Sequence, residues 1–293
     1  MHRAKERKLI RYAACLLLLA MTACAKDFDG KAALEYTRKA VEFGPRPPAS
    51  PAIHKLQAYI LAQLKLRHCE VTQDDFTAQT PVGPVAMKNI IARFPGKSGR
   101  AIVLTGHYDT KVLPNFVGAD DGGSSTGFLL EMAAILDGAA HKDDIYLVWF
   151  DGEEAYKEWT ATDSVYGSRH LAQKWASQGF LGRIKALINI DMIGDADLDI
   201  LRDGNSSQSL IRLIWETAEN NGYGQYFTKQ MSATEDDHIP FVRLGVNAAD
   251  VIDLDYRPWH TPQDTMDKLS AHSFQVVGDV IVAALRRIAE MPW

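Results

Sequence analysis

Short apolar stretches alternate along this chain with amphipathic segments of helical periodicity. Three of the apolar stretches have the length and composition of buried strands: Ala101–Gly106, Ile145–Phe150 and Ile184–Asp191. Helical segments follow the first two of them, at Gly123–Leu136 and Tyr166–Gln178. Strands that alternate with helices in this way predict an α/β fold. We expect a three-layer α/β/α sandwich around a mixed, mostly parallel sheet.

The N-terminal residues have a different character. Basic residues precede an apolar run, Ala13–Ala23, which is the layout of a secretory signal and is short for a membrane span. The run ends in LAMTAC, where Cys24 occupies the place of the lipidated cysteine of bacterial lipoproteins and Met21 replaces the usual leucine. An ordinary cleaved signal is the alternative. We expect residues 1–24 to be a lipoprotein signal and residues 25–293 to form one domain in the periplasm or cell envelope.

The composition restricts the partners and the chemistry of the mature chain. The sequence has 293 residues, 46% of them hydrophobic, and a formal net charge of -5. It can therefore build a sizeable core, and nothing in its charge indicates a nucleic-acid partner. Beyond residue 24 the only cysteine is Cys69. We therefore expect neither a disulfide framework nor a cysteine-based metal site.

Acidic and imidazole side chains gather where the predicted strands end. The carboxyl ends of strands form the ligand crevice of open α/β sheets, so these side chains should converge on one site. The candidate metal ligands are His107, Asp121, Glu154, Asp191 and His260. Oxygen and imidazole ligands without a thiolate suit a catalytic zinc ion. Asp121 taken alone could equally cap the helix that follows it, and it is the convergence that favours a ligand.

Two adjacent glutamates, Glu153 and Glu154, follow the apolar stretch that ends at Phe150. A solvated turn is the ordinary explanation for such a pair. Gly152 and the second acidic strand end at Asp191 favour a functional pair here instead. Neighbouring residues at the end of a strand point to opposite sides. One glutamate can therefore face a metal ion while the other faces the substrate.

Longer motifs resemble the zinc-dependent M28 aminopeptidase family, and more closely the glutaminyl cyclases (glutaminyl-peptide cyclotransferases) within it. The aminopeptidase-like pattern consists of HYD at 107–109, GADD at 118–121, DGEE at 151–154, Asp191 and HTPQDT at 260–265. The cyclase-like pattern adds the long match at 150–172, EDDHIPF at 235–241 and a tryptophan at 259. The resemblance covers about the whole mature chain and implies the fold of the zinc aminopeptidases.

The resemblance implies a metal site with one zinc ion per chain, held by Asp121, Glu154 and His260. His107 and Asp191 stand at the positions that help to bind a second zinc ion in the aminopeptidases. All five side chains are present, so a two-zinc M28 aminopeptidase remains the alternative. An inactive binding protein on the same scaffold is disfavoured because no ligand has been lost.

The resemblance also implies an activity: conversion of the N-terminal glutamine of peptides or proteins to pyroglutamate, with release of ammonia. Glu153 would be the proton shuttle, and Asp191 and Asp236 would form a hydrogen-bonded acidic network with it. Trp159 and Trp259 would line the substrate pocket. We expect a monomer, which is usual for this family.

The sequence departs from the animal cyclases at two places near the site. Gly106 stands where those enzymes carry one half of a disulfide, so that disulfide is absent. Asp250 stands where they carry a histidine, which changes the local charge by up to one unit. The HTPQDT sequence at 260–265 is also closer to the aminopeptidases. Trp159, Trp259 and Asp236 favour the cyclase.

Overall fold

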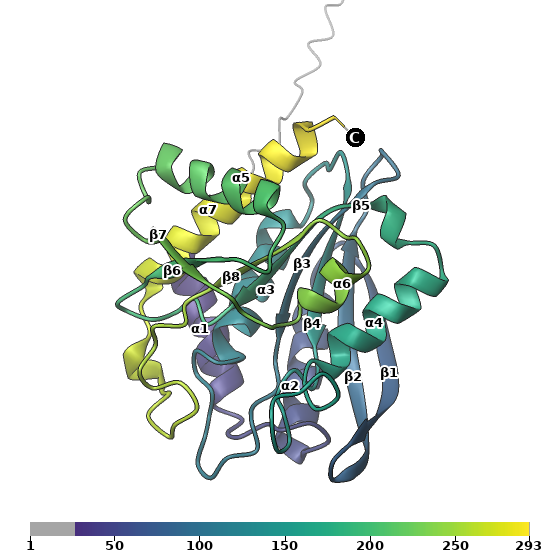
Figure 1. The fold of residues 1–293 in the computed structure, drawn as a ribbon, viewed down its shortest axis with the longest axis vertical. Helices are drawn as coiled ribbons and strands as arrows, with labels where there is room; N and C mark the ends of the chain where they lie inside the picture. Colours follow the sequence, from purple (N-terminus) through teal and green to yellow (C-terminus); the bar gives the residue numbers. More distant parts are fainter. Residues whose placement is uncertain (1–26, 293) are drawn as a thin grey trace, which may run out of the picture.

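The computed structural model describes residues 27–292, which form an α/β sandwich (Figure 1). The predicted signal, residues 1–24 with Cys24, lies outside this range. The helices are α1 (Gly30–Val41), α2 (Pro51–Leu64), α3 (Gly123–Leu136), α4 (Tyr166–Ser177), α5 (Gln208–Asn220), α6 (Ile239–Arg243) and α7 (Ala271–Glu290), with short 3-10 turns η1 (Leu181–Arg183) and η2 (Met266–Lys268). The strands are β1 (Glu70–Thr80), β2 (Gly83–Phe94), β3 (Ala101–His107), β4 (Asp144–Phe150), β5 (Ile184–Asp191), β6 (Ile200–Asp203), β7 (Phe227–Ser232) and β8 (Ala248–Ile252).

The central sheet has six strands in the order β1-β2-β4-β3-β5-β8. The strands β4, β3, β5 and β8 run parallel to one another, whereas β1 and β2 form an antiparallel hairpin that extends the sheet beyond β4. The predicted mixed, mostly parallel sheet is therefore confirmed. A small second sheet, in which β6 and β7 pair in parallel, was not expected from the sequence.

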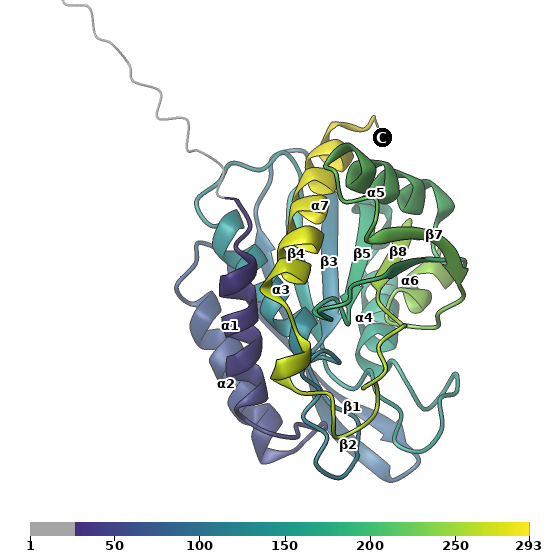
Figure 2. The same cartoon turned by 90° about the vertical axis from the view of Figure 1, so that its left-hand side faces the viewer.

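Alternating side chains of the parallel strands supply two separate cores. Ile102 and Leu104 of β3 join the core beneath α1, α2, α3, α5 and α7, whereas Val103 between them joins the core beneath α4 and α6. The helices therefore cover both faces of the sheet, which confirms the three-layer sandwich (Figure 2). Strands buried on both faces read as continuous apolar runs, which is why the sequence shows no alternation at 101–106.

The start of the described chain packs against the last helix. A Cβ placed on Gly278 of α7 would lie 2.1 Å from a ring carbon of Phe28, so only a glycine allows this close approach. Asp29 then caps α1 by accepting the backbone N–H groups of Lys31 and Ala32. Within residues 27–292, no helix is long and apolar enough to cross a membrane.

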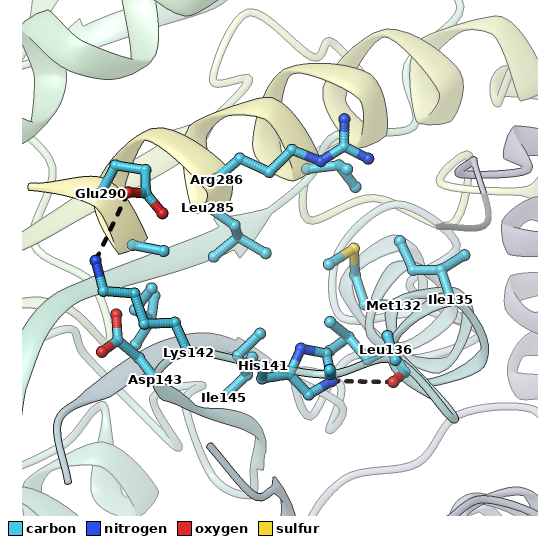
Figure 3. Close-up of a pocket in the computed structure, with 15 residues that line it drawn as sticks. Met132, Ile135, Leu136, His141, Lys142, Asp143, Ile145, Leu285, Arg286 and Glu290 are labelled. Carbon is cyan, nitrogen blue, oxygen red and sulfur yellow. Dashed lines mark hydrogen bonds and ion pairs between the residues drawn. The ribbon is translucent and has the colours of Figure 1, made fainter. Parts of the chain in front are cut away.

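A cavity of about 340 Å³ lies between α3, α7 and the beginnings of β3 and β4 (Figure 3). Ile102 and Ile145, which line it, are each the second residue of their strand. The cavity is therefore at the amino ends of the parallel strands, opposite to the carboxyl ends where the sequence predicts the site. None of the predicted site residues lines it.

Candidate active site

The predicted ligand residues lie at the carboxyl ends of the parallel strands or in the loops that follow. His107 is the last residue of β3, Glu154 follows β4, and Asp191 is the last residue of β5. Asp121 lies two residues before the start of α3, and His260 lies in the loop after β8. The topology therefore brings together side chains that are far apart in the sequence.

Asp121, Glu154 and His260 form one group. Nε2 of His260 is 3.2 Å from Oε1 of Glu154 and 3.3 Å from Oδ2 of Asp121. One potential ligand atom from each residue lies within 4.8 Å of the other two. The structure thus places the three side chains that the sequence assigns to one zinc ion within reach of a common point.

This donor set fits a divalent cation. Oδ2 of Asp121 is buried, and no hydrogen bond from the described residues reaches it. Burial opposes a positive charge on His260, but Asp121 and Glu154 raise its pKa to about 9. The two carboxylates therefore stabilise positive charge at the point where a metal ion would sit. Carboxylate and imidazole ligands are those of catalytic zinc sites.

A second group shares Asp121 with the first. Nε2 of His107 is 3.2 Å from Oδ1 of Asp121 and 3.2 Å from Oδ1 of Asp191. These three side chains also offer ligand atoms within 4.8 Å of one another, and all three are buried. Asp121 therefore turns one oxygen towards each group. The arrangement of side chains is compatible with either one ion or two.

Carboxylates that the sequence analysis had not singled out hold the ligand loops in place. Asp264 accepts the backbone N–H of Asp121 at 3.2 Å, and Asp109 accepts the backbone N–H groups of Glu153 and Glu154 at 3.1 and 3.5 Å. Both acceptors are fully buried. Each belongs to a motif quoted above, but its backbone partners lie too far away in the sequence to be predicted.

Arg46 fixes the loop between β3 and α3 from within. Its guanidinium donates to the carbonyl groups of Tyr108, Val117 and Gly118, the first at 3.1 Å and the last at 2.7 Å. The side chain is fully buried, and burial lowers its pKa to about 10 despite the neighbouring carboxylates. Its bonds tie together the two ends of the loop that separates His107 from Asp121.

The loop that carries His260 has an unusual backbone. His260 has a φ of 53°, in the left-handed region that non-glycine residues rarely adopt. Such backbone strain is concentrated at functional sites. The indole ring of Trp259 stacks on the imidazole with a centroid separation of 4.2 Å, and Phe116 meets the imidazole edge-on. Trp259 is 45% exposed, so it lies at the mouth of the site.

Glu153 is buried beside the second group of ligands, at His107. Its Oε2 is 4.0 Å from Nδ1 of His107. Burial raises the pKa of Glu153 well above its ordinary value; the charge of His107 opposes this change, whereas Glu154 and Asp236 reinforce it. A carboxyl group that holds its proton more tightly than usual is suited to both accept and return one.

Asp236 lies close enough to Glu153 to act on its charge, and Asp191 acts on Asp236 in turn. Burial raises the pKa of Asp236 to about 6, and the charge of Asp191 adds to the effect. Within residues 27–292, however, neither carboxylate is hydrogen bonded to Glu153. Asp191 contacts His107 and Asp236 accepts from Asn189. The influence of Asp236 on Glu153 is electrostatic in this arrangement.

Trp159 lies in the loop between β4 and α4 and is 39% exposed. Asp163 fixes this loop by accepting the backbone N–H groups of Tyr156, Lys157 and Glu158. The place of Trp159 in the substrate pocket stays a prediction.

Lys111, which the sequence analysis did not weigh, lies 3.0 Å from Oε2 of Glu154. This ion pair leaves Oε1 of Glu154 to face Nε2 of His260.

An α/β sandwich with buried carboxylate and imidazole ligands at the carboxyl edge of its sheet defines the class of metallopeptidase-like proteins. The family model described as peptidase family M28 matches residues 89–285, and the chain belongs to this family. The family resemblance inferred from the motifs is thereby confirmed.

Individual relatives identify the branch of the family. The chain is 34% identical over 238 residues to a glutaminyl-peptide cyclotransferase of Drosophila melanogaster, a match that covers 71% of this chain and 67% of that protein. It therefore spans about two thirds of the length of that relative. The crystal structure of an Acidobacteriales bacterium glutaminyl cyclase is 42% identical with a TM-score of 0.88, and the match covers 92% of this chain and 97% of that one. The glutaminyl cyclase of Porphyromonas gingivalis is 28% identical with a TM-score of 0.81, covering 89% and 98%.

Proposed function

We propose that this protein is a glutaminyl-peptide cyclotransferase that converts an N-terminal glutamine to pyroglutamate and releases ammonia. The observation that carries the proposal is the position of Glu153: it is buried directly beside a complete set of metal ligands, in a chain similar to glutaminyl cyclases over nearly its whole described length. The substrates are peptides or proteins that begin with glutamine.

We infer that one zinc ion per chain is bound by Asp121, Glu154 and His260. When bound, it would supply Lewis-acid polarisation of the side-chain amide carbonyl of the substrate. The nucleophile is the α-amine of the substrate itself, so no activated water is required. A second metal ion would have no bridging water to activate. The alternative function is a two-zinc aminopeptidase, in which His107, Asp121 and Asp191 would bind the second zinc ion.

Glu153 carries the proton transfers of the reaction. The α-amine nitrogen forms a bond to the side-chain amide carbon, and Glu153 accepts the proton that this nitrogen loses. The bond from that carbon to the amide nitrogen then breaks, and Glu153 returns the proton to the leaving nitrogen, which departs as ammonia. Burial, Glu154 and Asp236 keep the affinity of Glu153 for its proton high enough for both steps, and Asp191 raises the pKa of Asp236. Trp159 and Trp259 wall the pocket and favour the ring-forming conformer of the glutamine.

Separate incubations with a Gln-initiated and a Leu-initiated peptide test the proposal. We expect ammonia and a cyclised product from the first peptide and no change in the second. Release of free leucine from the second peptide, without cyclisation of the first, would show an aminopeptidase instead. Mass spectrometry of both peptides distinguishes these outcomes, because cyclisation removes the mass of one ammonia molecule, whereas hydrolysis removes a whole residue.

We also propose that the protein is exported and anchored in the cell envelope through a lipid on Cys24. The support is the sequence of residues 1–24. Labelling with a radioactive fatty acid should mark the wild-type protein and leave Cys24→Ser unlabelled. Equal labelling of both, or of neither, would contradict the lipid anchor. We expect the mature protein to be a monomer by light scattering.

A further inference from the structure

A buried histidine, His238, lies between two carboxylates. Its Nε2 is 3.1 Å from Oδ2 of Asp203, and its Nδ1 is 3.8 Å from Oδ2 of Asp250. The three side chains come from different elements, β6, β8 and the residue before α6, and all are completely buried. Buried polar groups need partners, and an imidazole between two carboxylates offers one to each of them.

Asp203 binds both ends of the turn that carries Asp236. Its Oδ1 accepts the backbone N–H of Thr234 at 2.8 Å, while its Oδ2 faces His238. Thr234 and His238 stand two residues before and two residues after Asp236. The hydroxyl of Ser206 also donates to Asp203, at 2.6 Å. A single buried carboxylate thus fixes the turn on both sides of the predicted catalytic aspartate.

Asn189 connects this cluster to Asp236 directly. Its side-chain nitrogen donates to Oδ1 of Asp236 and to Oδ1 of Asp250, both at 3.1 Å. The hydroxyl of Thr105 donates to its side-chain oxygen at 2.7 Å, which fixes the orientation of the amide. The carboxylates of Asp236 and Asp250 therefore share the side-chain nitrogen of Asn189 as their donor. Two negative charges this close would repel each other. His238 lies between Asp203 and Asp250 and faces each of them with one ring nitrogen.

The electrostatics of the cluster agree with its geometry. Burial opposes the ionisation of Asp203, but hydrogen bonds from His238, Ser206 and the backbone of Thr234 lower its pKa below the ordinary value. Burial, with the charges of Asp236 and Asp191, raises the pKa of Asp250. Asp203 is thus the carboxylate that retains its charge next to His238.

We propose that His238 and Asp203 are positioning residues for the cyclisation, which together hold the carboxylate of Asp236 at Asn189. The inference rests on the proposed function of the site.

Neutral substitutions test the pair. His238→Gln removes the imidazole that contacts Asp203 and Asp250, so kcat should fall about tenfold or more while KM stays within about twofold. Asp203→Asn added to this variant replaces the contact between imidazole and carboxylate by two amides. The double variant should recover kcat to within about threefold of the wild type, because the remaining groups can pair as neutral partners.

His170→Gln is the matched control. His170 also lies beside a buried aspartate, with its Nε2 3.3 Å from Asp74, but it packs between α4 and β1 outside the site. Its substitution should leave kcat unchanged. An unchanged kcat in His238→Gln, or a double variant that is no more active than His238→Gln, would overturn the proposal.

Melting temperatures separate this proposal from the proposed function. The Tm should follow the same pattern as kcat. We expect His238→Gln to lower the Tm and the double variant with Asp203→Asn to recover most of the loss. If the wild-type protein releases no ammonia from Gln-initiated peptides, the proposed function fails, but recovery of the Tm still demonstrates the pair. If His238→Gln does not fold, a folded double variant supports the pairing and an unfolded one contradicts it.

Discussion

Glu153 and Glu154 are neighbours in the chain, yet their carboxylates face different partners. Glu154 lies 3.2 Å from Nε2 of His260, whereas Glu153 lies 4.0 Å from Nδ1 of His107. The backbone N–H groups of both donate to the carboxylate of Asp109, which fixes their directions. Adjacent acids at the end of a buried strand can therefore serve as metal ligand and proton carrier without competing for one position.

Replacing Glu153 by Gln should abolish turnover and leave the metal site intact. The amide has nearly the same shape but cannot accept the proton of the attacking amine, and general acid–base groups contribute about 10²–10⁴-fold to rates. Ammonia release under saturating substrate measures the loss, and metal analysis of the same preparation provides the control. A variant with its zinc retained and a rate near that of the wild type would remove Glu153 from the mechanism.

Replacing Arg46 by Met should destabilise the protein and weaken metal binding. The carbonyl groups of Tyr108, Val117 and Gly118 would lose a charged donor, so we expect the free energy of unfolding to fall by about 3–5 kcal/mol. Zinc affinity should decrease about 10–100-fold because the loop that precedes Asp121 is no longer fixed. Denaturant titrations and competition with a chelator measure the two effects.

Arg183→Met is the control for Arg46, since Arg183 is partly exposed and pairs with Asp144 beside η1. It should reduce stability by about 1 kcal/mol or less and leave zinc affinity unchanged. Equal losses of stability in the two variants would show that Arg46 has no special role in the loop.

Replacing Trp259 by Ala should reduce kcat/KM for Gln-initiated peptides about tenfold. The variant removes the ring that stacks on His260 and exposes the mouth of the site to water. Trp259→Phe should retain most of the activity because it keeps an aromatic face. The control is Leu66→Ala, which removes another exposed apolar side chain just beyond α2. Identical kinetics for Trp259→Ala and Leu66→Ala would exclude Trp259 from the substrate pocket.

Asp253 should make stability depend on pH between about 4 and 7. Burial raises its pKa to about 7, with further contributions from Asp195 and Asp199. The folded protein therefore holds this proton more tightly than the unfolded chain. The stabilisation is complete below the unfolded pKa of about 4 and is lost as the pH rises to 7, a change on the order of 3 kcal/mol.

Asp253→Asn should remove this dependence. The variant should be less stable than the wild type at pH 4, since its side chain has one acceptor oxygen for the backbone N–H groups of Asp199 and Asp255. Above pH 7 it should be at least as stable, so the two curves of unfolding free energy against pH cross. The exposed neighbour Asp197 provides the control variant, Asp197→Asn. Parallel curves for wild type and Asp253→Asn would contradict the expectation.

The sequence revealed most of the sheet and the ligand set because both follow simple rules. Strands buried on two faces are continuous apolar runs, and the polar residues after them, such as His107 and Glu154, must meet at one edge. The β6–β7 pair was missed because Phe227–Ser232 is largely polar and partly exposed. Short strands of this kind carry no periodic signal.

The supporting contacts could not be predicted because they join residues that are remote in the sequence. Asp264 accepts a backbone N–H that lies 143 positions away, and Arg46 donates to a carbonyl 72 positions away. The ion contact of His238 with Asp203 likewise depends on how the turn before α6 packs on β6. The left-handed backbone of His260 could not be predicted either, because the residue type gives no sign of it.

Zinc titration of the metal-free protein tests the central claim most directly. Ammonia release from a Gln-initiated peptide should rise linearly with added zinc and reach its maximum at one equivalent per chain, and His260→Ala should bind no zinc tightly and remain inactive. An activity that requires two equivalents, or one that persists in the chelator-treated protein, would contradict the assignment of a single catalytic zinc ion to Asp121, Glu154 and His260.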